Sequence, residues 1–249
     1  MLPLNGTARL VSDLHLRRER PDLTRRFATF LADTAASNVD TLFILGDLFE
    51  YWIGDDDLTD SFNAEVCALL RGTVDRGTRI CFMAGNRDFL IGERFATVAG
   101  VRLLPETAKV GAGETAILLL HGDTLCTDDL PYQEFRRMVR SAQWQRDFLA
   151  RPLAERRIEV ESLRRRSTQA KREKPPALMD ANPGAIRAAL ADHDCTRLIH
   201  GHTHRPGHER IQLATASAQR WVLSDWDIGR GDALEISPAG DIRRIDLSA

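Results

Sequence analysis

The chain has no uninterrupted apolar run of the roughly 18 residues that a membrane-spanning helix needs, and it does not begin with a charged region followed by an apolar signal core. Its four cysteines show no Cys-x-x-Cys spacing, and it contains no internal repeat or long low-complexity segment. These absences argue against a membrane span, a secretion signal, a disulfide framework and a disordered chain. They favour reduced, partly buried thiols.

A strong overall charge is also missing. The 34 basic and 36 acidic residues give a net charge of -2 at pH 7, which does not by itself indicate a nucleic-acid or acidic partner. The distribution is uneven, because residues 132–174 hold thirteen basic and six acidic side chains, a net of +7, whereas the remainder carries -9. A basic module therefore belongs to an acidic body, and 249 residues suffice for one large domain with an insertion.

Short apolar runs recur along the chain, and each ends in a polar cluster. Continuous apolar runs of this length are typical of buried strands. We predict such strands at 9–12, 41–45, 79–83, 115–120 and 196–199. Amphipathic helical patterns lie between them, and this alternation indicates an α/β fold. Three shorter runs, at 221–224, 233–236 and 242–247, predict a second, more antiparallel sheet.

The segment from about Leu130 to Met179 breaks this alternation. It is rich in arginine, favours helix and is bracketed by Pro131 and the Pro175–Pro176 pair. We interpret residues 129–179 as an inserted helical cap that would act as a lipid and substrate lid, and residues 1–128 and 180–249 as the core. Its apolar side chains either pack the helices together or form an apolar groove lined by cations.

Residue types that bind metal ions follow nearly every predicted strand, where α/β folds place their sites. The five clusters are Asp13-Leu14-His15, Gly46-Asp47, Gly85-Asn86-Arg87, His121-Gly122-Asp123 and Gly201-His202-Thr203-His204. Any one of them is weak evidence, but five in order are hard to attribute to chance. Imidazole and carboxylate together suit Mn²⁺, Fe²⁺ or Zn²⁺. His200 and His208 are interpreted as orienting or surface residues, and His193 as structural.

This succession resembles the calcineurin-like metallophosphoesterase superfamily over about residues 8–128 and from 180 onward. The resemblance implies a four-layer α/β/β/α sandwich, here with the inserted helical cap, and two adjacent metal ions. One ion would be held by Asp13, His15, Asp47 and His204. The other would be held by Asp47, Asn86, His121 and His202. Two such ions lower the pKa of a bridging water and neutralise phosphoryl oxygens.

Longer stretches, at 46–57, 85–92, 121–129 and 200–206, resemble the UDP-2,3-diacylglucosamine pyrophosphohydrolase family of lipid A biosynthesis, and the likeness extends through the cap. The resemblance implies hydrolysis of a UDP-diacylglucosamine glycolipid by water attack on the α-phosphorus, giving UMP and 2,3-diacylglucosamine 1-phosphate. It also implies two Mn²⁺ ions per chain and a peripheral location on the cytoplasmic side of the bacterial inner membrane. No nucleic acid or protein partner is predicted.

Motif position implies the roles of individual residues. The catalytic residues would be Asp47, Asn86, Arg87 and His121. The substrate contacts would be Asn86, Arg87, Asp129, Ser167, Lys171, Lys174 and His202. Lys171 departs from the family pattern, in which a short amide is expected, whereas Glu50 agrees with the narrower family.

Arg87 follows Asn86, where many relatives in the superfamily carry a histidine thought to protonate the leaving group. Arginine stays protonated at neutral pH but can clamp a phosphate through paired hydrogen bonds. A phosphate leaving group is therefore predicted. The alternatives are a cyclic-nucleotide phosphodiesterase or phosphoprotein phosphatase, which needs neither Arg87 nor a basic, apolar cap, and a scaffold that has lost its metals, against which the intact ligand set argues.

Overall fold

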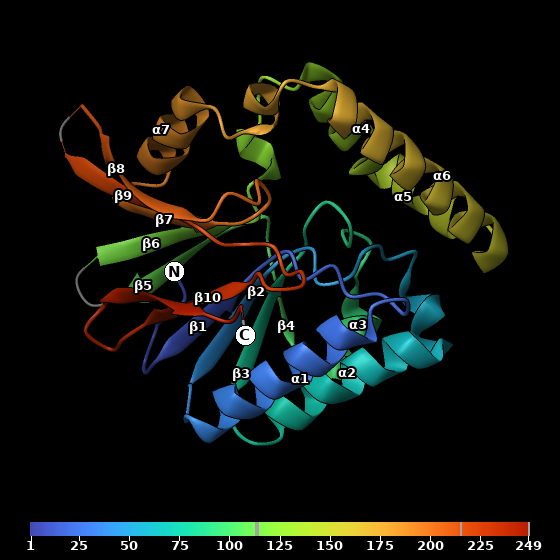
Figure 1. Ribbon diagram of the computed structural model, residues 1–249, viewed down its shortest axis with the longest axis horizontal. Helices are drawn as coiled ribbons and strands as arrows, with labels where there is room; N and C mark the ends of the chain where they lie inside the picture. The colour runs from blue at the N-terminus through green and yellow to red at the C-terminus, as the bar shows by residue number, and fades with distance from the viewer. Residues whose placement is uncertain (113–114, 215, 249) are drawn as a thin grey trace.

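The computed structural model describes residues 1–112, 115–214 and 216–248, and the side chains of 112, 115, 166–173 and 176–177 lie outside the description. The chain forms four layers, helix, sheet, sheet and helix, and three further helices lie beyond one end of the sheets (Figure 1). The predicted four-layer α/β/β/α sandwich is therefore confirmed.

The first sheet has six strands in the order β11-β10-β1-β2-β3-β4. Their bounds are β1 Ala8–Val11, β2 Thr41–Leu45, β3 Arg79–Met83, β4 Arg102–Leu104, β10 Asp232–Ile236 and β11 Ile242–Asp246. Strands β1 to β4 run parallel, and β10 and β11 join antiparallel. Every residue of β1 and β2 is buried, because helices cover one face of this sheet and the second sheet covers the other.

The second sheet has five strands in the order β5-β6-β7-β9-β8. Their bounds are β5 Thr107–Ala112, β6 Thr115–Leu120, β7 Arg197–His200, β8 Gly207–Gln212 and β9 Ser217–Val222. The prediction that the three C-terminal runs make their own antiparallel sheet is wrong. β9 extends this sheet parallel to β7, whereas β10 and β11 complete the first sheet beside β1. An apolar pattern predicts a strand but does not specify its partner.

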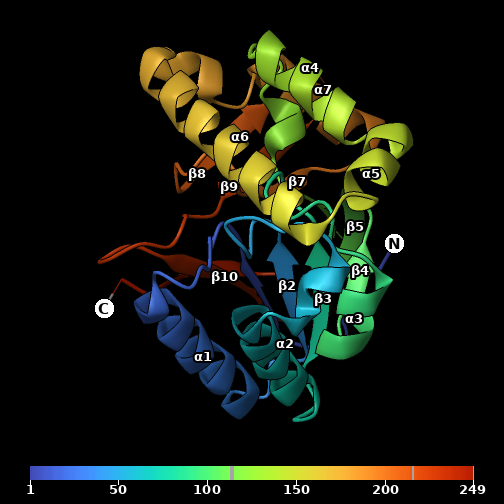
Figure 2. The same cartoon turned by 90° about the vertical axis from the view of Figure 1, so that its right-hand side faces the viewer.

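Helices α1 (Pro21–Ala36), α2 (Ser61–Val74) and α3 (Glu93–Ala99) cover the outer face of the first sheet, and α7 (Pro183–Asp192) covers that of the second (Figures 1 and 2). Capping side chains explain where two of these helices begin. Asp60 accepts a hydrogen bond from the Phe62 amide at 2.9 Å to cap α2, and Asn182 accepts one from the Gly184 amide at 2.7 Å to cap α7.

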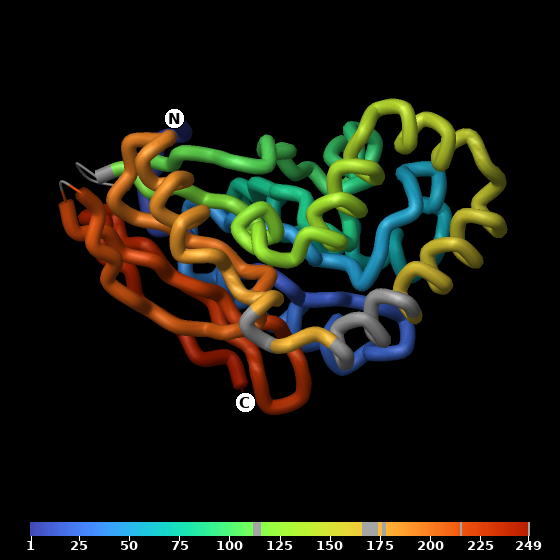
Figure 3. Tube along the Cα trace, turned by 90° about the horizontal axis from the view of Figure 1, so that it is seen from above, coloured from blue at the N-terminus to red at the C-terminus, as the bar shows by residue number. Residues whose placement is uncertain are grey.

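The cap helices are α4 (Leu130–Val139), α5 (Ala142–Leu149) and α6 (Leu153–Glu173), and they lie over the ends of the strands (Figure 2). Seen from above, they gather toward one end of the long axis of the molecule (Figure 3). Single-turn helices lie at Asp55–Thr59 (η1), Asp123–Leu125 (η2) and Pro176–Met179 (η3). Within the described ranges, no helix combines the length and apolar character that crossing a bilayer requires.

Arg156 fastens α6 to the core. Its side chain is almost fully buried, and its guanidinium donates to the Ile53 carbonyl at 2.5 Å and to Asp56 Oδ1 at 3.0 Å. Gly54 leaves the space for it, since a Cβ at Gly54 would lie 2.5 Å from Arg156 Nη1. Helix α6 is therefore anchored to the segment 50–57, which follows Asp47 along the chain.

We expect Arg156→Ala to lower the free energy of unfolding by about 2–4 kcal/mol, because it leaves a cavity and a buried carbonyl without its donor. Urea unfolding measures this change. The matched control is Arg165→Ala on the same helix, since Arg165 is exposed and pairs with Glu161 across one turn at 3.6 Å. That change is expected to stay within about 0.5 kcal/mol of the parent. Equal unfolding midpoints for the two variants would contradict the anchoring role.

Candidate metal centre and adjoining cavity

The predicted metal ligands come together at one end of the two sheets. Asp13 and His15 follow β1, Asp47 follows β2 and Asn86 follows β3, all from the first sheet. From the second sheet, His121 follows β6, and His202 and His204 follow β7. Ligand atoms of Asp13, His15 and His204 lie within 4.8 Å of one another, as do those of Asp13, Asp47 and His121.

Several of these residues have an unusual backbone conformation. Seven non-glycine residues in the described parts of the chain have positive φ, and five are predicted ligands. These five are Asp13 (55°), His15 (49°), Asp47 (53°), His202 (66°) and His204 (55°). Such conformations cost on the order of 1 kcal/mol or more each and persist only where the surrounding structure enforces them. The tight turns direct successive side chains toward the same point.

Two glycines permit the close approach of the turns. A Cβ on Gly85 would lie 2.2 Å from Asp47 Oδ1, and a Cβ on Gly201 would lie 2.0 Å from Ser12 Oγ. Both distances are far below van der Waals contact. Glycine is therefore required where each turn meets its neighbour.

The first cluster has the donor atoms that a cation would satisfy. Asp13 Oδ2 accepts hydrogen bonds from the His202 amide at 2.8 Å and from Ser12 Oγ at 2.5 Å. Asp13 Oδ1 is buried without a hydrogen-bond donor and lies 3.4 Å from His204 Nε2. The Nε2 atoms of His15 and His204 face each other at 3.3 Å. A carboxylate oxygen and two imidazoles that meet in this way fit a divalent cation.

The second cluster fits a cation for a similar reason. The Nδ1 atom of His121 lies 2.7 Å from the Leu45 carbonyl, which fixes Nδ1 as the donor, so Nε2 of the neutral ring is an acceptor. That Nε2 faces two more acceptors, Asn86 Oδ1 at 3.0 Å and Asp47 Oδ1 at 3.7 Å. Three acceptors around one point suit a borderline divalent metal ion.

The charges at the centre affect one another strongly. Burial raises the pKa of Asp47 to about 7, although His121 opposes the shift. Burial lowers the pKa of His204, but the neighbouring Asp13 and Asp225 carboxylates outweigh it and raise that pKa to about 9. Without a cation the centre therefore retains protons near neutral pH. A metal ion that binds there displaces protons and takes over their role.

Two supporting carboxylates are not evident from the sequence. Asp88 is fully buried and accepts from the Gly85 amide at 2.7 Å and from the Leu48 amide at 2.8 Å, so it ties together the turns that carry Asp47 and Asn86. Asp225 lies 3.3 Å from His204 Nδ1 and orients that ring. Asp88 falls within the motif at 85–92, but nothing local indicates partners about 40 residues away.

The remaining histidines lie outside the two clusters. His200 is buried, and its Nε2 accepts from Arg220 Nε at 2.8 Å. Burial, together with Arg220, lowers its pKa to about 3. His208 stacks on Trp221 with ring centroids 3.9 Å apart, and His193 Nδ1 lies 2.9 Å from the Ala189 carbonyl at the end of α7. These positions agree with orienting, surface and structural roles.

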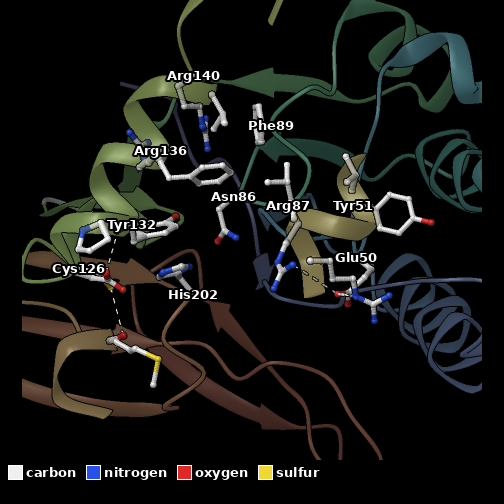
Figure 4. A pocket seen from close by; sticks show the side chains of 18 of the residues that line it. Glu50, Tyr51, Asn86, Arg87, Phe89, Cys126, Tyr132, Arg136, Arg140 and His202 are labelled. Atoms are coloured by element: carbon white, nitrogen blue, oxygen red, sulfur yellow. Dashed lines mark hydrogen bonds and ion pairs between the residues drawn. The ribbon is translucent and has the colours of Figure 1, made fainter. Parts of the chain in front are cut away.

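A cavity of about 610 Å³ lies between the centre and the cap helices (Figure 4). One part of its lining is apolar, and much of it comes from the cap. These residues are Phe89, Leu90, Phe135, Val139, Trp144, Phe148, Val160 and Leu163. Another part is polar or cationic, and it comprises Asn86, Arg87, Arg136, Arg140, Arg164, Lys174 and His202. The apolar side chains of the cap therefore line a groove with cations and also contribute to packing, because Phe148 belongs to the core as well.

Five of the seven predicted substrate contacts line this cavity: Asn86, Arg87, Asp129, Lys174 and His202. Asp129 and Lys174 form an ion pair at 2.6 Å, and Asp129 also caps α4. The side chains of Ser167 and Lys171 lie outside the described part of the chain. The prediction for these two residues therefore stays a prediction.

Helix α4 contributes contacts that the sequence does not predict. Arg136 Nε donates to Asp123 at 2.6 Å, and Arg140 Nη2 donates to the Gly85 carbonyl at 2.8 Å, beside Asn86. The Tyr132 ring stacks on His202 at a centroid distance of 5.8 Å. These residues bring the cap against the turns that carry the predicted ligands (Figure 4). The basic composition of the segment was the only sequence signal for them.

Comparison with known proteins agrees with this geometry. A family model for calcineurin-like phosphoesterases matches residues 9–206. Among curated proteins, two relatives named UDP-2,3-diacylglucosamine hydrolase are close. The one from Aromatoleum aromaticum is 49% identical over 220 residues, 88% of this chain and 89% of the relative. The one from Chromohalobacter salexigens is 46% identical over 225 residues, 90% and 91% of the two chains.

Two solved structures share the fold. A dimetal phosphatase from Danio rerio superposes with a TM-score of 0.51 at 11% identity and covers 98% of this chain and 99% of its own. An archaeal phosphodiesterase superposes with a TM-score of 0.50 at 12% identity and covers 96% and 99%. At these identities the likeness is one of fold.

Proposed function

The chain belongs to the calcineurin-like phosphoesterase family, and from this premise we propose that it is a metal-dependent hydrolase that cleaves the diphosphate of UDP-2,3-diacylglucosamine in lipid A biosynthesis. The products are UMP and 2,3-diacylglucosamine 1-phosphate. Relatives at 43–49% identity over about nine tenths of the chain bear the name of this hydrolase.

The observation that carries the proposal is the two-sided cavity beside the metal centre. The proposed substrate joins two acyl chains to a sugar and a diphosphate. Its binding site therefore needs an apolar wall and a cationic wall next to the reacting phosphorus. The cavity supplies the first from the cap helices and the second from Arg87, Arg136, Arg140 and Arg164. A small soluble phosphoester, such as a cyclic nucleotide, would use neither the apolar wall nor most of these cations.

For the metals we propose two Mn²⁺ ions. Asp13, His15, Asp47 and His204 would hold one, and Asp47, Asn86, His121 and His202 the other. When bound, such ions activate water and offset the charge of the phosphoryl group. The protein's share is to orient the ligands, which Asp225 does for His204 and the Leu45 carbonyl does for His121.

Water attack on the α-phosphorus leaves the lipid sugar phosphate as the leaving group. That group is already an anion and needs charge stabilisation more than a proton. Arg87 lines the cavity next to Asn86 and stays protonated, so it suits this task. Asp129, Ser167, Lys171, Lys174 and His202 are proposed contacts for the sugar and phosphate end.

We further propose that the protein works peripherally at the cytoplasmic face of the bacterial inner membrane. The cap helices combine arginines with exposed apolar side chains, among them Leu130 and Ile158, which are 71% and 68% exposed. Basic and apolar residues on one surface favour contact with anionic lipid. Residues 129–179 would then serve as the lipid and substrate lid of a core formed by 1–128 and 180–249.

Incubation with UDP-2,3-diacylglucosamine and Mn²⁺ in ¹⁸O-labelled water tests the function. We expect UMP and 2,3-diacylglucosamine 1-phosphate, with the label in UMP because water attacks the α-phosphorus. Mass spectrometry identifies both products and the position of the label. Chelation by EDTA should abolish turnover, and added Mn²⁺ should restore it. Label in the lipid phosphate would move the attack to the β-phosphorus, and faster hydrolysis of cyclic AMP would favour the rival phosphodiesterase.

A further inference from the structure

We propose that Glu50 is a positioning residue that holds two guanidinium groups, one from the core and one from the cap, as a paired clamp for the substrate's diphosphate. The inference rests on the proposed function, because the diphosphate is the anion that the clamp would receive. Glu50 stands three residues after Asp47 and is 7% exposed. Its Oε2 lies 3.8 Å from Nδ1 of the predicted ligand His15, and its side chain lines the cavity, so it lies between the two.

Three arginines from different parts of the chain surround the Glu50 carboxylate. Its Oε2 accepts from Arg17 Nη1 at 2.9 Å, and its Oε1 lies 3.0 Å from Arg164 Nε and 3.9 Å from Arg87 Nη1. Arg17 and Arg87 belong to the core, whereas Arg164 comes from α6. Glu50, Arg87 and Arg164 all line the cavity, and Figure 4 shows the pairing of Glu50 with Arg87.

The charges of this group do not balance. Three guanidinium groups around one carboxylate leave an excess of positive charge at a wall of the cavity. A guanidinium has five N–H donors, more than one shared carboxylate can accept, so donors remain for a second anion. Arginine pairs bind phosphate through such parallel hydrogen bonds. A diphosphate completes the charge and the hydrogen bonding of this wall.

Segment 50–57 also positions the part of α6 that carries Arg164. Arg156 anchors α6 on Ile53 and Asp56, eight residues before Arg164. Eight residues are about 12 Å along a helix, or just over two turns, so the two side chains leave α6 about 80° apart around its axis. Segment 50–57 thus holds α6 at two points. Arg164 lies beside Glu50 and Arg87 only when α6 packs on this segment. The position of the cap is therefore linked to phosphate binding.

A plain stabilising ion pair is the rival account, and the sign of an anion-binding change separates the two. If Glu50 acts only through its charge, Glu50→Gln removes a repulsive carboxylate and tightens phosphate binding. If Glu50 positions Arg87 and Arg164, the same change weakens phosphate binding because the two donors lose their arrangement. We expect a weakening of about fivefold for inorganic phosphate, measured by calorimetric titration of the metal-loaded protein.

A double-mutant cycle on turnover gives the second test. Glu50→Gln and Arg164→Gln are each expected to lower kcat/KM for UDP-2,3-diacylglucosamine about tenfold. The double variant should be no more than about threefold less active than the less active single variant. Independent residues would multiply to about a hundredfold loss. Arg25→Gln, at an exposed position of α1 outside the cap, serves as the control and should leave kcat/KM unchanged.

Melting temperature and metal content are measured on every variant, because His15 Nδ1 lies 3.8 Å from Glu50 Oε2. Multiplicative losses in the cycle, or tighter phosphate binding by Glu50→Gln, would overturn the clamp. If the parent protein does not hydrolyse the glycolipid, the proposed function fails. The phosphate titration then still decides whether Glu50 positions the two arginines.

Discussion

Replacing Asp47 with alanine is expected to lower kcat by more than about 100-fold. Removing a residue that only hydrogen-bonds to a metal ligand already lowers metal affinity or activity about 10–100-fold. Asp47 is itself the residue implied to bridge both ions, so its loss should have a larger effect. Its Oδ1 lies 3.7 Å from His121 Nε2 and its Oδ2 lies 4.0 Å from His15 Nε2, so the carboxylate faces both sides of the centre. The measurement is turnover of UDP-2,3-diacylglucosamine together with metal content by mass spectrometry.

Two further variants separate charge from backbone effects. Asp47 has φ of 53°, a region that alanine tolerates poorly and asparagine better, so Asp47→Asn removes the charge with little added strain. We expect it to lose most of the activity as well. Asp192→Ala, an exposed aspartate at the end of α7, is the control and should leave kcat unchanged. An Asp47→Ala protein that is replete with metal and retains more than about a tenth of the parent's turnover would contradict the assignment.

The second large effect is expected from one added methyl group. Gly85→Ala places a Cβ 2.2 Å from Asp47 Oδ1 and 2.5 Å from the Asp47 amide nitrogen, and the second of these is a backbone atom that no side-chain rotation can move away. The two turns must therefore move apart, which separates Asn86 from Asp47. We expect a loss of stability of about 1–3 kcal/mol. Metal affinity and turnover should fall with it, each by more than about 10-fold, as followed by metal titration and steady-state assay.

Gly72→Ala is the matched control for this change. Gly72 lies in α2, and a Cβ there would have no atom within 4 Å. Alanine favours helix over glycine by about 1 kcal/mol, so the variant should be as stable as the parent or more stable, with unchanged turnover. Normal metal affinity in the Gly85→Ala protein would show that the turns can separate without cost to the centre.

The central strands could be predicted from the sequence because they are buried on both faces. The predicted 41–45, 79–83 and 115–120 coincide with β2, β3 and β6. Strands β4, β5 and β8 were not predicted, since each lies at the edge of a sheet, where a continuous apolar run is not required. β8 is largely exposed, and β4 has only three residues. The partners of β9, β10 and β11 depend on long-range packing, which a local pattern does not contain.

The candidate ligands could also be predicted, because each follows a strand and parallel strands end at a shared edge. The sequence could not show that the ends of two separate sheets face one point, since this depends on how the sheets pack. Arg156 illustrates a different limit. One arginine among many in a basic segment carries no local sign of burial, yet this side chain is buried against a carbonyl about 100 residues earlier in the chain.

The order of the ligands along the chain has a consequence for biosynthesis. The first cluster unites Asp13 and His15 with His204, and β10 and β11 must still add to β1 before the first sheet is complete. A nascent chain on the ribosome therefore carries its first coordinating groups long before their partners have been translated. The first cluster can therefore coordinate an ion only after His204 has been synthesised and β7 has taken its place in the second sheet.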